Sequence, residues 1–84
     1  MYDCLITFRS VMPAQRAEGM LRQIGIECSV GRTPKWMERQ GCGYSLRLDR
    51  RHMERVVALL DAHKISYRKL YLHREDGGVE EVRL

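Results

Sequence analysis

The apolar residues of this chain follow two spacings, one of every second residue and one of every third or fourth. Alternation is typical of strands that bury one face, and the longer spacing is typical of amphipathic helices. The alternating segments are residues 3–8, 26–30, 43–48 and 66–73. The helical spacing covers residues 11–24 and the segment that follows Asp49 and runs to about His63. The pattern therefore predicts four strands and two helices in the order βαββαβ.

Each predicted helix carries one apolar stripe and a recognisable terminal signal. Ser10 stands at the N-cap position of the first helix, and Gly25 follows that helix as a C-terminal stop. Asp49 is the corresponding cap of the second helix. We expect the two stripes to form the core with one face of the sheet, through Met20, Leu21, Ile24, Val56, Val57 and Leu60.

This order of elements is that of the ferredoxin-like fold, in the α+β class. Right-handed crossovers give a four-stranded antiparallel sheet of order 4-1-3-2 with both helices on one face. Residues 1–74 then form a single domain, and residues 75–84 are either a peripheral tail, which we favour, or a short extra strand. Because strands 1 and 3 are antiparallel neighbours, Arg9 and Ser10 are expected beside the start of strand 3.

The composition is that of a small globular protein. The 84 residues are 44% apolar and 31% charged, which suits one modest core. No apolar run approaches the roughly 20 residues that span a bilayer, and the first residues lack the features of a signal peptide. We therefore expect a soluble, cytoplasmic protein with no membrane partner. Its net charge of +4 favours anionic partners only weakly.

The three cysteines are odd in number and irregularly spaced, which argues against a disulfide framework and against a zinc site. The three histidines are scattered, so we expect no metal. Cys4 and Cys28 lie in predicted strands, where a free cysteine is usually a small buried hydrophobic residue. Cys42 instead stands between Gly41 and Gly43, which leaves its sulfur and the neighbouring amides accessible. Cys42 is therefore the candidate nucleophile.

Basic residues surround the predicted loop 32–42 that contains this cysteine. They are Arg9, Arg32, Lys35 and Arg39. Nearby cations and a helix N-terminus stabilise a thiolate, and the predicted topology supplies both. The alternative is an exposed loop cysteine among independently solvated basic side chains. Trp36 is either a lid over Cys42 or a core residue beneath the loop.

Several short motifs in this order resemble the DUF3343 family of selenium/sulfur carrier-like proteins, over about residues 5 to 72. The matching motifs are Thr7-Phe8-Arg9-Ser10, Ala17-Glu18 with Leu21, Gly25-Ile26, Thr33-Pro34-Lys35, and Cys42-Gly43 with Tyr44-Ser45-Leu46-Arg47. The loop of the family usually reads Pro-Thr-Pro-Arg. Here Arg32 replaces the first proline and Lys35 replaces the arginine, which weakens a bidentate contact to an anion. Gln40-Gly41 replaces the serines that often precede the cysteine.

The resemblance implies that Cys42 carries sulfur or selenium as a persulfide or selenopersulfide, without another cofactor. It also implies donor and acceptor proteins as partners, such as a cysteine desulfurase. The residues expected to bind an anion or a partner beside Cys42 are Arg9, Ser10, Arg32, Thr33, Lys35, Arg39, Gly41 and Gly43.

Two other classes of function stay open at this point. One is a non-enzymatic binding or regulatory module, for nucleic acid or for a protein partner, including a homodimer formed through edge strands. Nucleic acid is disfavoured because Phe8 and Tyr44 are the only aromatic residues on strands 1 and 3. The other class is an enzyme that transfers sulfur to a small acceptor, and a carrier is favoured over such a stand-alone enzyme. The sequence does not decide between sulfur and selenium.

Overall fold

The computed structural model describes residues 2–33 and 43–83. It contains two α-helices, one short 3-10 helix and an antiparallel sheet, as expected for the α+β class. In chain order the elements are β1 (Cys4–Phe8), α1 (Val11–Gln23), β2 (Cys28–Arg32), β3 (Tyr44–Leu48), η1 (Arg50–His52), α2 (Met53–Ala62), β4 (Leu70–His73) and β5 (Val79–Val82).

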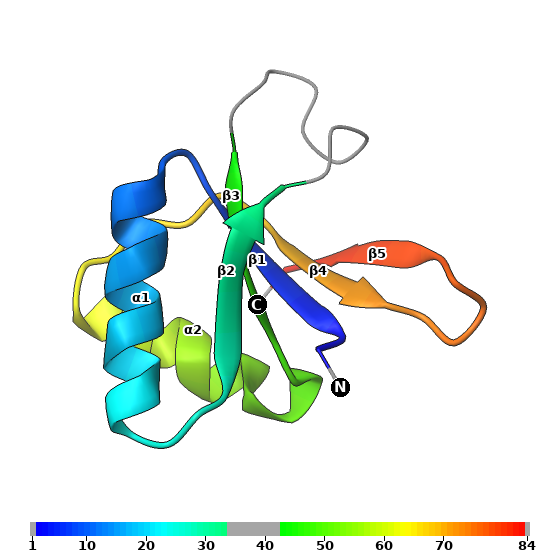
Figure 1. The fold of residues 1–84 in the computed structure, drawn as a ribbon. Coiled ribbons are helices and arrows are strands. Elements are labelled where there is room, and N and C mark those ends of the chain that lie inside the picture. The colour runs from blue at the N-terminus through cyan, green and yellow to red at the C-terminus, as the bar shows by residue number, and fades with distance from the viewer. Residues whose placement is uncertain (1, 34–42, 84) are drawn as a thin grey trace.

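The sheet has five strands in the order β2-β3-β1-β4-β5, and all neighbours are antiparallel. The prediction of a four-stranded sheet was wrong, because β5 is added beside β4. Within the larger sheet, the first four strands keep the predicted relative order, with β1 between β3 and β4. Both helices lie on one side of the sheet (Figure 1).

The fifth strand depends on a tight turn after β4. Gly77 has a φ of 88°, which favours glycine, and its N–H donates to the Arg74 carbonyl at 3.1 Å. The Asp76 carboxylate accepts the Gly78 N–H at 2.8 Å, and the Arg74 N–H donates to the Gly78 carbonyl. This turn reverses the chain, so Val79–Val82 pairs with β4 where the sequence favoured a tail.

The core lies between the two helices and one face of the sheet. Of the six predicted core residues, Leu21, Val56, Val57 and Leu60 are buried and Met20 is partly buried. The prediction was wrong for Ile24, whose side chain is 44% exposed. The sheet contributes one face of β1 and β3, through Cys4, Ile6, Phe8, Leu46 and Leu48.

The end of α1 explains the error at Ile24. The Ile26 N–H donates to the Leu21 carbonyl at 2.9 Å, and the Gly25 N–H donates to the Arg22 carbonyl at 3.2 Å. This pair of bonds is the Schellman motif, with Gly25 in the left-handed region at a φ of 82°. The motif turns the chain so that Ile26, only 3% exposed, enters the core in place of Ile24. The next strand therefore begins at Cys28, two residues later than predicted.

Candidate functional site

The β2–β3 hairpin and β1 reach one end of the sheet together. Arg32 is paired with Tyr44, and Phe8 is paired with the same tyrosine from the other side. The ladder continues by one more bond, because the Thr33 N–H donates to the Gly43 carbonyl at 3.0 Å. We call this end of the sheet the loop end, and define it by Arg9, Ser10, Arg32, Thr33 and Gly43. The structure therefore brings five of the predicted site residues to one end of the sheet.

The other predicted site residues are Lys35, Arg39, Gly41 and Cys42, and they lie outside the described residues, as does Trp36. Cys42 directly precedes Gly43 in the chain. The described part of the loop end therefore consists of the residues that flank this segment on both sides, together with the start of α1.

The N-terminus of α1 has no capping side chain. Ser10 occupies the N-cap position, but its hydroxyl makes no capping hydrogen bond. The hydroxyl of an N-cap serine normally accepts from the second or third amide of the helix, and the third residue here is Pro13, which has no N–H. The first turn also lacks acidic residues. The positive end of the helix dipole is thus available to an anion.

The two arginines of the loop end, Arg9 and Arg32, are exposed. Neither makes a hydrogen bond or an ion pair with another residue in the described ranges. Arg32 ends β2 and Arg9 follows β1, and these two strands lie about 10 Å apart because β3 runs between them. An arginine without an acidic partner retains its full capacity to bind an anion.

Alternation along β2 and β3 places other side chains on the opposite face, which carries no helix. On that face the hydroxyls of Thr33 and Ser45 are buried, and neither has a hydrogen-bond partner among the described residues. Leaving a buried hydroxyl unpaired costs about 1–3 kcal/mol. Ser45 was not predicted as a site residue, because a serine within an alternating strand is normally read as solvent-exposed.

Arg47 was also missed by the sequence reasoning. It shares the helix-free face of β3 with Ser45, and its guanidinium lies 4.0 Å from the position that a Cβ would take at Gly31. Arg47 is exposed and has no ion-pair partner in the described part of the chain. The only available signal was its presence in the motif that follows Cys42, and a motif does not tell where a side chain points.

Thr7 lies on the same helix-free face, but its polar groups are satisfied. The Arg68 N–H donates to the Thr7 carbonyl at 2.7 Å, and the Lys69 N–H donates to the Thr7 hydroxyl at 3.1 Å. In return, the Thr7 N–H donates to the Lys69 carbonyl at 2.9 Å. Two successive amides thus oppose one residue, which interrupts the regular ladder. For this reason β4 starts at Leu70 rather than at the predicted residue 66.

Cys4 and Cys28 are buried, as predicted. Burial raises the pKa of the Cys4 thiol to about 11, and the nearby Asp3 carboxylate adds to this effect. Burial also raises the pKa of Cys28, with a contribution from Glu18. Both groups are therefore neutral thiols at physiological pH, and a neutral thiol is a poor nucleophile.

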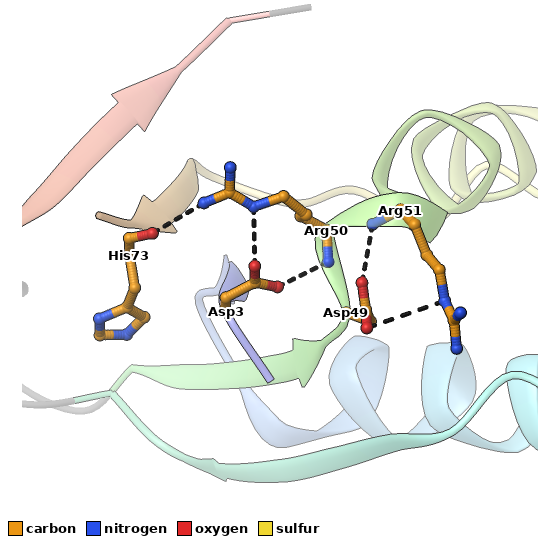
Figure 2. Close-up of polar contacts among 5 residues, drawn as sticks. All are labelled: Asp3, Asp49, Arg50, Arg51 and His73. Atoms are coloured by element: carbon orange, nitrogen blue, oxygen red, sulfur yellow. Dashed lines mark hydrogen bonds and ion pairs between the residues drawn. The ribbon is translucent and has the colours of Figure 1, made fainter. Parts of the chain in front are cut away.

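The opposite end of the sheet is held by a cluster that joins three segments (Figure 2). The Asp3 carboxylate accepts the backbone N–H and the Nε–H of Arg50, each at 2.7 Å. Arg50 Nη2 donates to the His73 carbonyl at 2.8 Å, and the His73 N–H donates to the Asp3 carbonyl. Burial alone would raise the pKa of Asp3, but the bonds from Arg50 outweigh it and hold that pKa below its usual value. We call Asp3, Arg50 and His73 the clamped end.

Within residues 2–33 and 43–83, no group of three or more histidine, cysteine or acidic side chains is arranged to hold a metal ion. Neither described helix is long and apolar enough to cross a membrane.

One family model matches the chain, over residues 3–72, and its description is "Putative Se/S carrier protein-like". No curated protein and no solved structure shows significant similarity to the chain. The matched segment covers most of the 84 residues and includes every element from β1 to the first part of β4. It also includes all five residues of the loop end. The chain therefore belongs to the family of selenium/sulfur carrier-like proteins.

Proposed function

We propose that the protein is a small cytoplasmic carrier that holds a sulfur or selenium atom on Cys42, as a persulfide or selenopersulfide. Family membership supports the general function of carrying one of these atoms. The assignment to Cys42 is our inference from the thiols of this chain. Cys4 and Cys28 are buried and have raised pKa values, which makes both of them poor carriers.

The single observation that carries the proposal is the bond between Thr33 and Gly43. It joins the two sides of the segment that contains Cys42, and it does so next to Arg9, Arg32 and the uncapped start of α1. A helix N-terminus and free guanidinium groups favour a thiolate and attract an anionic partner. The same features suit a terminal persulfide, which is also an anion.

The transfer step that we propose needs no oxidant or reductant. The Cys42 thiolate attacks the outer sulfur of a persulfide on the donor, for example a cysteine desulfurase. A new S–S bond forms on Cys42, the S–S bond of the donor breaks, and the donor leaves as a thiolate. Delivery to the acceptor is the same exchange, in which Cys42 leaves as the thiolate. Selenium follows the same scheme with a selenium atom in place of the outer sulfur.

In this proposal the remaining predicted residues serve the anion or the partner protein. The flanking glycines, Gly41 and Gly43, leave the thiol open, since they add no side chain beside it. The basic residues Arg9, Arg32, Lys35 and Arg39 contribute positive charge, while Ser10 and Thr33 contribute hydroxyls. A carrier requires access by two partners in turn, so an exposed site suits it better than a deep pocket.

Intact mass spectrometry tests the proposal directly. The protein is incubated with a cysteine desulfurase and cysteine, and in parallel with a selenium donor, and is then measured without reductant. We expect a gain of one sulfur or selenium atom on the protein. The Cys42→Ser variant should lose this gain. A Cys4→Ser/Cys28→Ser double variant that remains folded should keep it.

The decisive comparison is between these two variants. If Cys42→Ser accumulates sulfur and selenium as well as the unchanged protein does, Cys42 is not the carrier residue. Circular dichroism of each variant checks that the fold is intact, so that a lost gain is not caused by unfolding.

A further inference from the structure

The helix-free face contains a row of small residues near the loop end. Gly31, Ser45 and Thr7 are paired across β2, β3 and β1, so their side-chain positions form one line. Gly31 has no positive φ, so its backbone does not require glycine. A Cβ at this position would meet only Arg47, at 4.0 Å. The absence of a side chain at residue 31 therefore leaves space over Gly31, which is the cross-strand neighbour of Ser45.

The guanidinium of Arg47 borders the space over Gly31. Arg47 lies two residues beyond Ser45 on the same face of β3, but its side chain reaches back along the sheet to Gly31. It thus points toward the loop end. Arg47 makes no ion pair or hydrogen bond with the described residues, although exposed arginines elsewhere in the fold, such as Arg50, do.

Near this space, the hydroxyls of Ser45 and Thr33 lack hydrogen-bond partners among the described residues. Ser45 is 0% exposed and Thr33 is 7% exposed, and both oxygens are without a hydrogen-bond partner in the described part of the chain. Thr33 is two residues from Gly31 on β2 and therefore faces the same side of the sheet. The contrast with Thr7 is informative, because the Thr7 hydroxyl on this face has its partner in Lys69. Of the hydroxyls of Thr7, Ser45 and Thr33, the last two are thus the ones without a partner among the described residues.

We propose that Arg47, Ser45 and Thr33 form a binding site for a small tetrahedral oxyanion on the helix-free face beside the loop end. Such an anion presents several acceptor oxygens, which suit the fork of N–H donors of an arginine and the two hydroxyls. The guanidinium has no other charged partner among the described residues, and each hydroxyl gains the partner that it lacks there.

Binding requires one local movement. Ser45 is 0% and Thr33 is 7% exposed, so the exposed Arg47 side chain must swing away from Gly31 to uncover the two hydroxyls. The anion can then lie between the guanidinium and the hydroxyls. Side chains of this kind change rotamer within nanoseconds, so the movement does not limit binding. Once the anion is bound, Arg47 contacts it from the solvent side.

The biological meaning of this site rests on the proposed carrier function, because a sulfur or selenium oxyanion would then be held close to the segment that contains Cys42. The binding itself does not depend on Cys42. It can therefore be measured in the Cys42→Ser variant, where failure to bind and failure to carry sulfur are separate results.

The test is a titration of the ¹⁵N-labelled Cys42→Ser protein, followed by the amide shifts of Gly31, Thr33, Ser45 and Arg47. Sodium sulfate, thiosulfate and phosphate are added separately at constant ionic strength, with chloride as the reference. We expect saturable shifts at these four amides with at least one of the three oxyanions and none with chloride. Tighter binding of thiosulfate or sulfate identifies a sulfur oxyanion, and tighter binding of phosphate identifies a phosphoryl group; either result supports the site.

Three variants in the same background assign the binding to these side chains. Arg47→Ala should weaken it by roughly tenfold or more, because a charge-assisted contact is lost. Arg16→Ala is the matched control, since Arg16 is exposed on α1 and should leave the affinity unchanged. Ser45→Ala should weaken binding by about threefold to tenfold without lowering the unfolding midpoint, because its hydroxyl has no structural partner to lose. The proposal is wrong if no saturable shifts occur, if Arg16→Ala reduces the affinity as much as Arg47→Ala, or if Ser45→Ala leaves the affinity unchanged.

Discussion

The two ends of the central strands are held in different ways. At the clamped end, one arginine joins three segments of the chain, and its donors find acceptors in Asp3 and His73. At the loop end, Arg9 and Arg32 have no acidic partner in the described ranges, and the Thr33 hydroxyl is unpaired as well. A domain of this size can leave one end polar and unpaired only if the rest of the structure supplies its stability. We interpret this difference as a division of roles, in which the clamped end stabilises the fold and the loop end is proposed to serve binding.

The thiols follow the same division. Cys4 lies next to Asp3 at the clamped end, is fully buried, and has a pKa raised to about 11. Cys42 directly precedes Gly43 of the loop end. The chain thus has one thiol in the core at the clamped end, and Cys42 is adjacent in sequence to a residue of the loop end.

The loop end is attached to the hydrophobic core through Phe8. Phe8 is the last residue of β1, directly before Arg9 and Ser10 in the chain, and its side chain is 0% exposed. Phe8→Ala should lower the free energy of unfolding by about 3–5 kcal/mol, because it removes buried surface and leaves a cavity. Urea titration followed by circular dichroism measures the effect, with Met12→Ala as the control because Met12 is 66% exposed. A loss below about 1 kcal/mol would mean that the base of the loop end is loosely packed.

Two hydroxyls on the helix-free face should respond in opposite ways. Thr7→Val should lower the free energy of unfolding by about 1–3 kcal/mol, because the Lys69 N–H loses its acceptor. Thr7→Ser should retain most of the stability, since it keeps the hydroxyl. Ser45→Ala should leave the stability unchanged or raise it, because an unpaired buried hydroxyl is removed.

Thermal unfolding of these three variants under identical conditions measures the difference. If Ser45→Ala destabilises the protein as much as Thr7→Val, the Ser45 hydroxyl has a structural role. The two hydroxyls would then not differ in the way that their hydrogen bonding predicts.

The smallest effects compare one charged residue from each end. Asp3→Asn should cost about 1 kcal/mol, since Arg50 is half exposed and solvent screens its contribution. Arg9→Ala should change the stability by less than about 0.5 kcal/mol, because Arg9 has no partner to lose within residues 2–33 and 43–83. Denaturant titrations at neutral pH measure both values.

The same pair of variants predicts a difference in pH dependence. The pKa of Asp3 in the folded protein lies below its ordinary value of 3.8. Its contribution is therefore present at higher pH and is lost as the pH falls through the folded pKa. Asp3→Asn should lack this acid-sensitive component, whereas Arg9→Ala should keep it. Identical acid profiles for Asp3→Asn and the unchanged protein would contradict the role of the clamp.

Local patterns predicted most of the fold. The helices, the central position of β1 and the stop at Gly25 follow from spacing and glycine placement, which act over a few residues. Short or non-periodic features were missed. Val79–Val82 holds too few alternating residues to be distinguished from a tail, and Ile24 fits the helical spacing although the Schellman motif turns it outward. Lys64, which follows the C-cap residue of α2, has a φ of 56°, and glycine is the residue normally expected at that position.

The candidate site was predicted in part, for a different reason. The strand order brought Arg9 and Ser10 to the start of β3, so topology alone placed these residues correctly beside Gly43. The pairing of Asp3 with Arg50 joins residues far apart in the chain, and no spacing rule indicates it. Likewise, the unpaired Ser45 hydroxyl and the direction of Arg47 depend on what the tertiary structure leaves unfilled. The role of Cys42 stays a prediction.

The pH dependence of alkylation at each cysteine tests the central claim, that the reactive thiol belongs to the loop end. Iodoacetamide is applied to the folded protein between pH 5 and pH 11, and peptide mapping gives the rate at each position. Cys42 should react fastest, with a midpoint below the value of about 8.5 for a free cysteine. Cys4 should react only as the pH approaches its raised pKa of about 11. If Cys42 titrates as a free thiol and reacts no faster than Cys4 and Cys28, the loop end does not activate it and the account is contradicted.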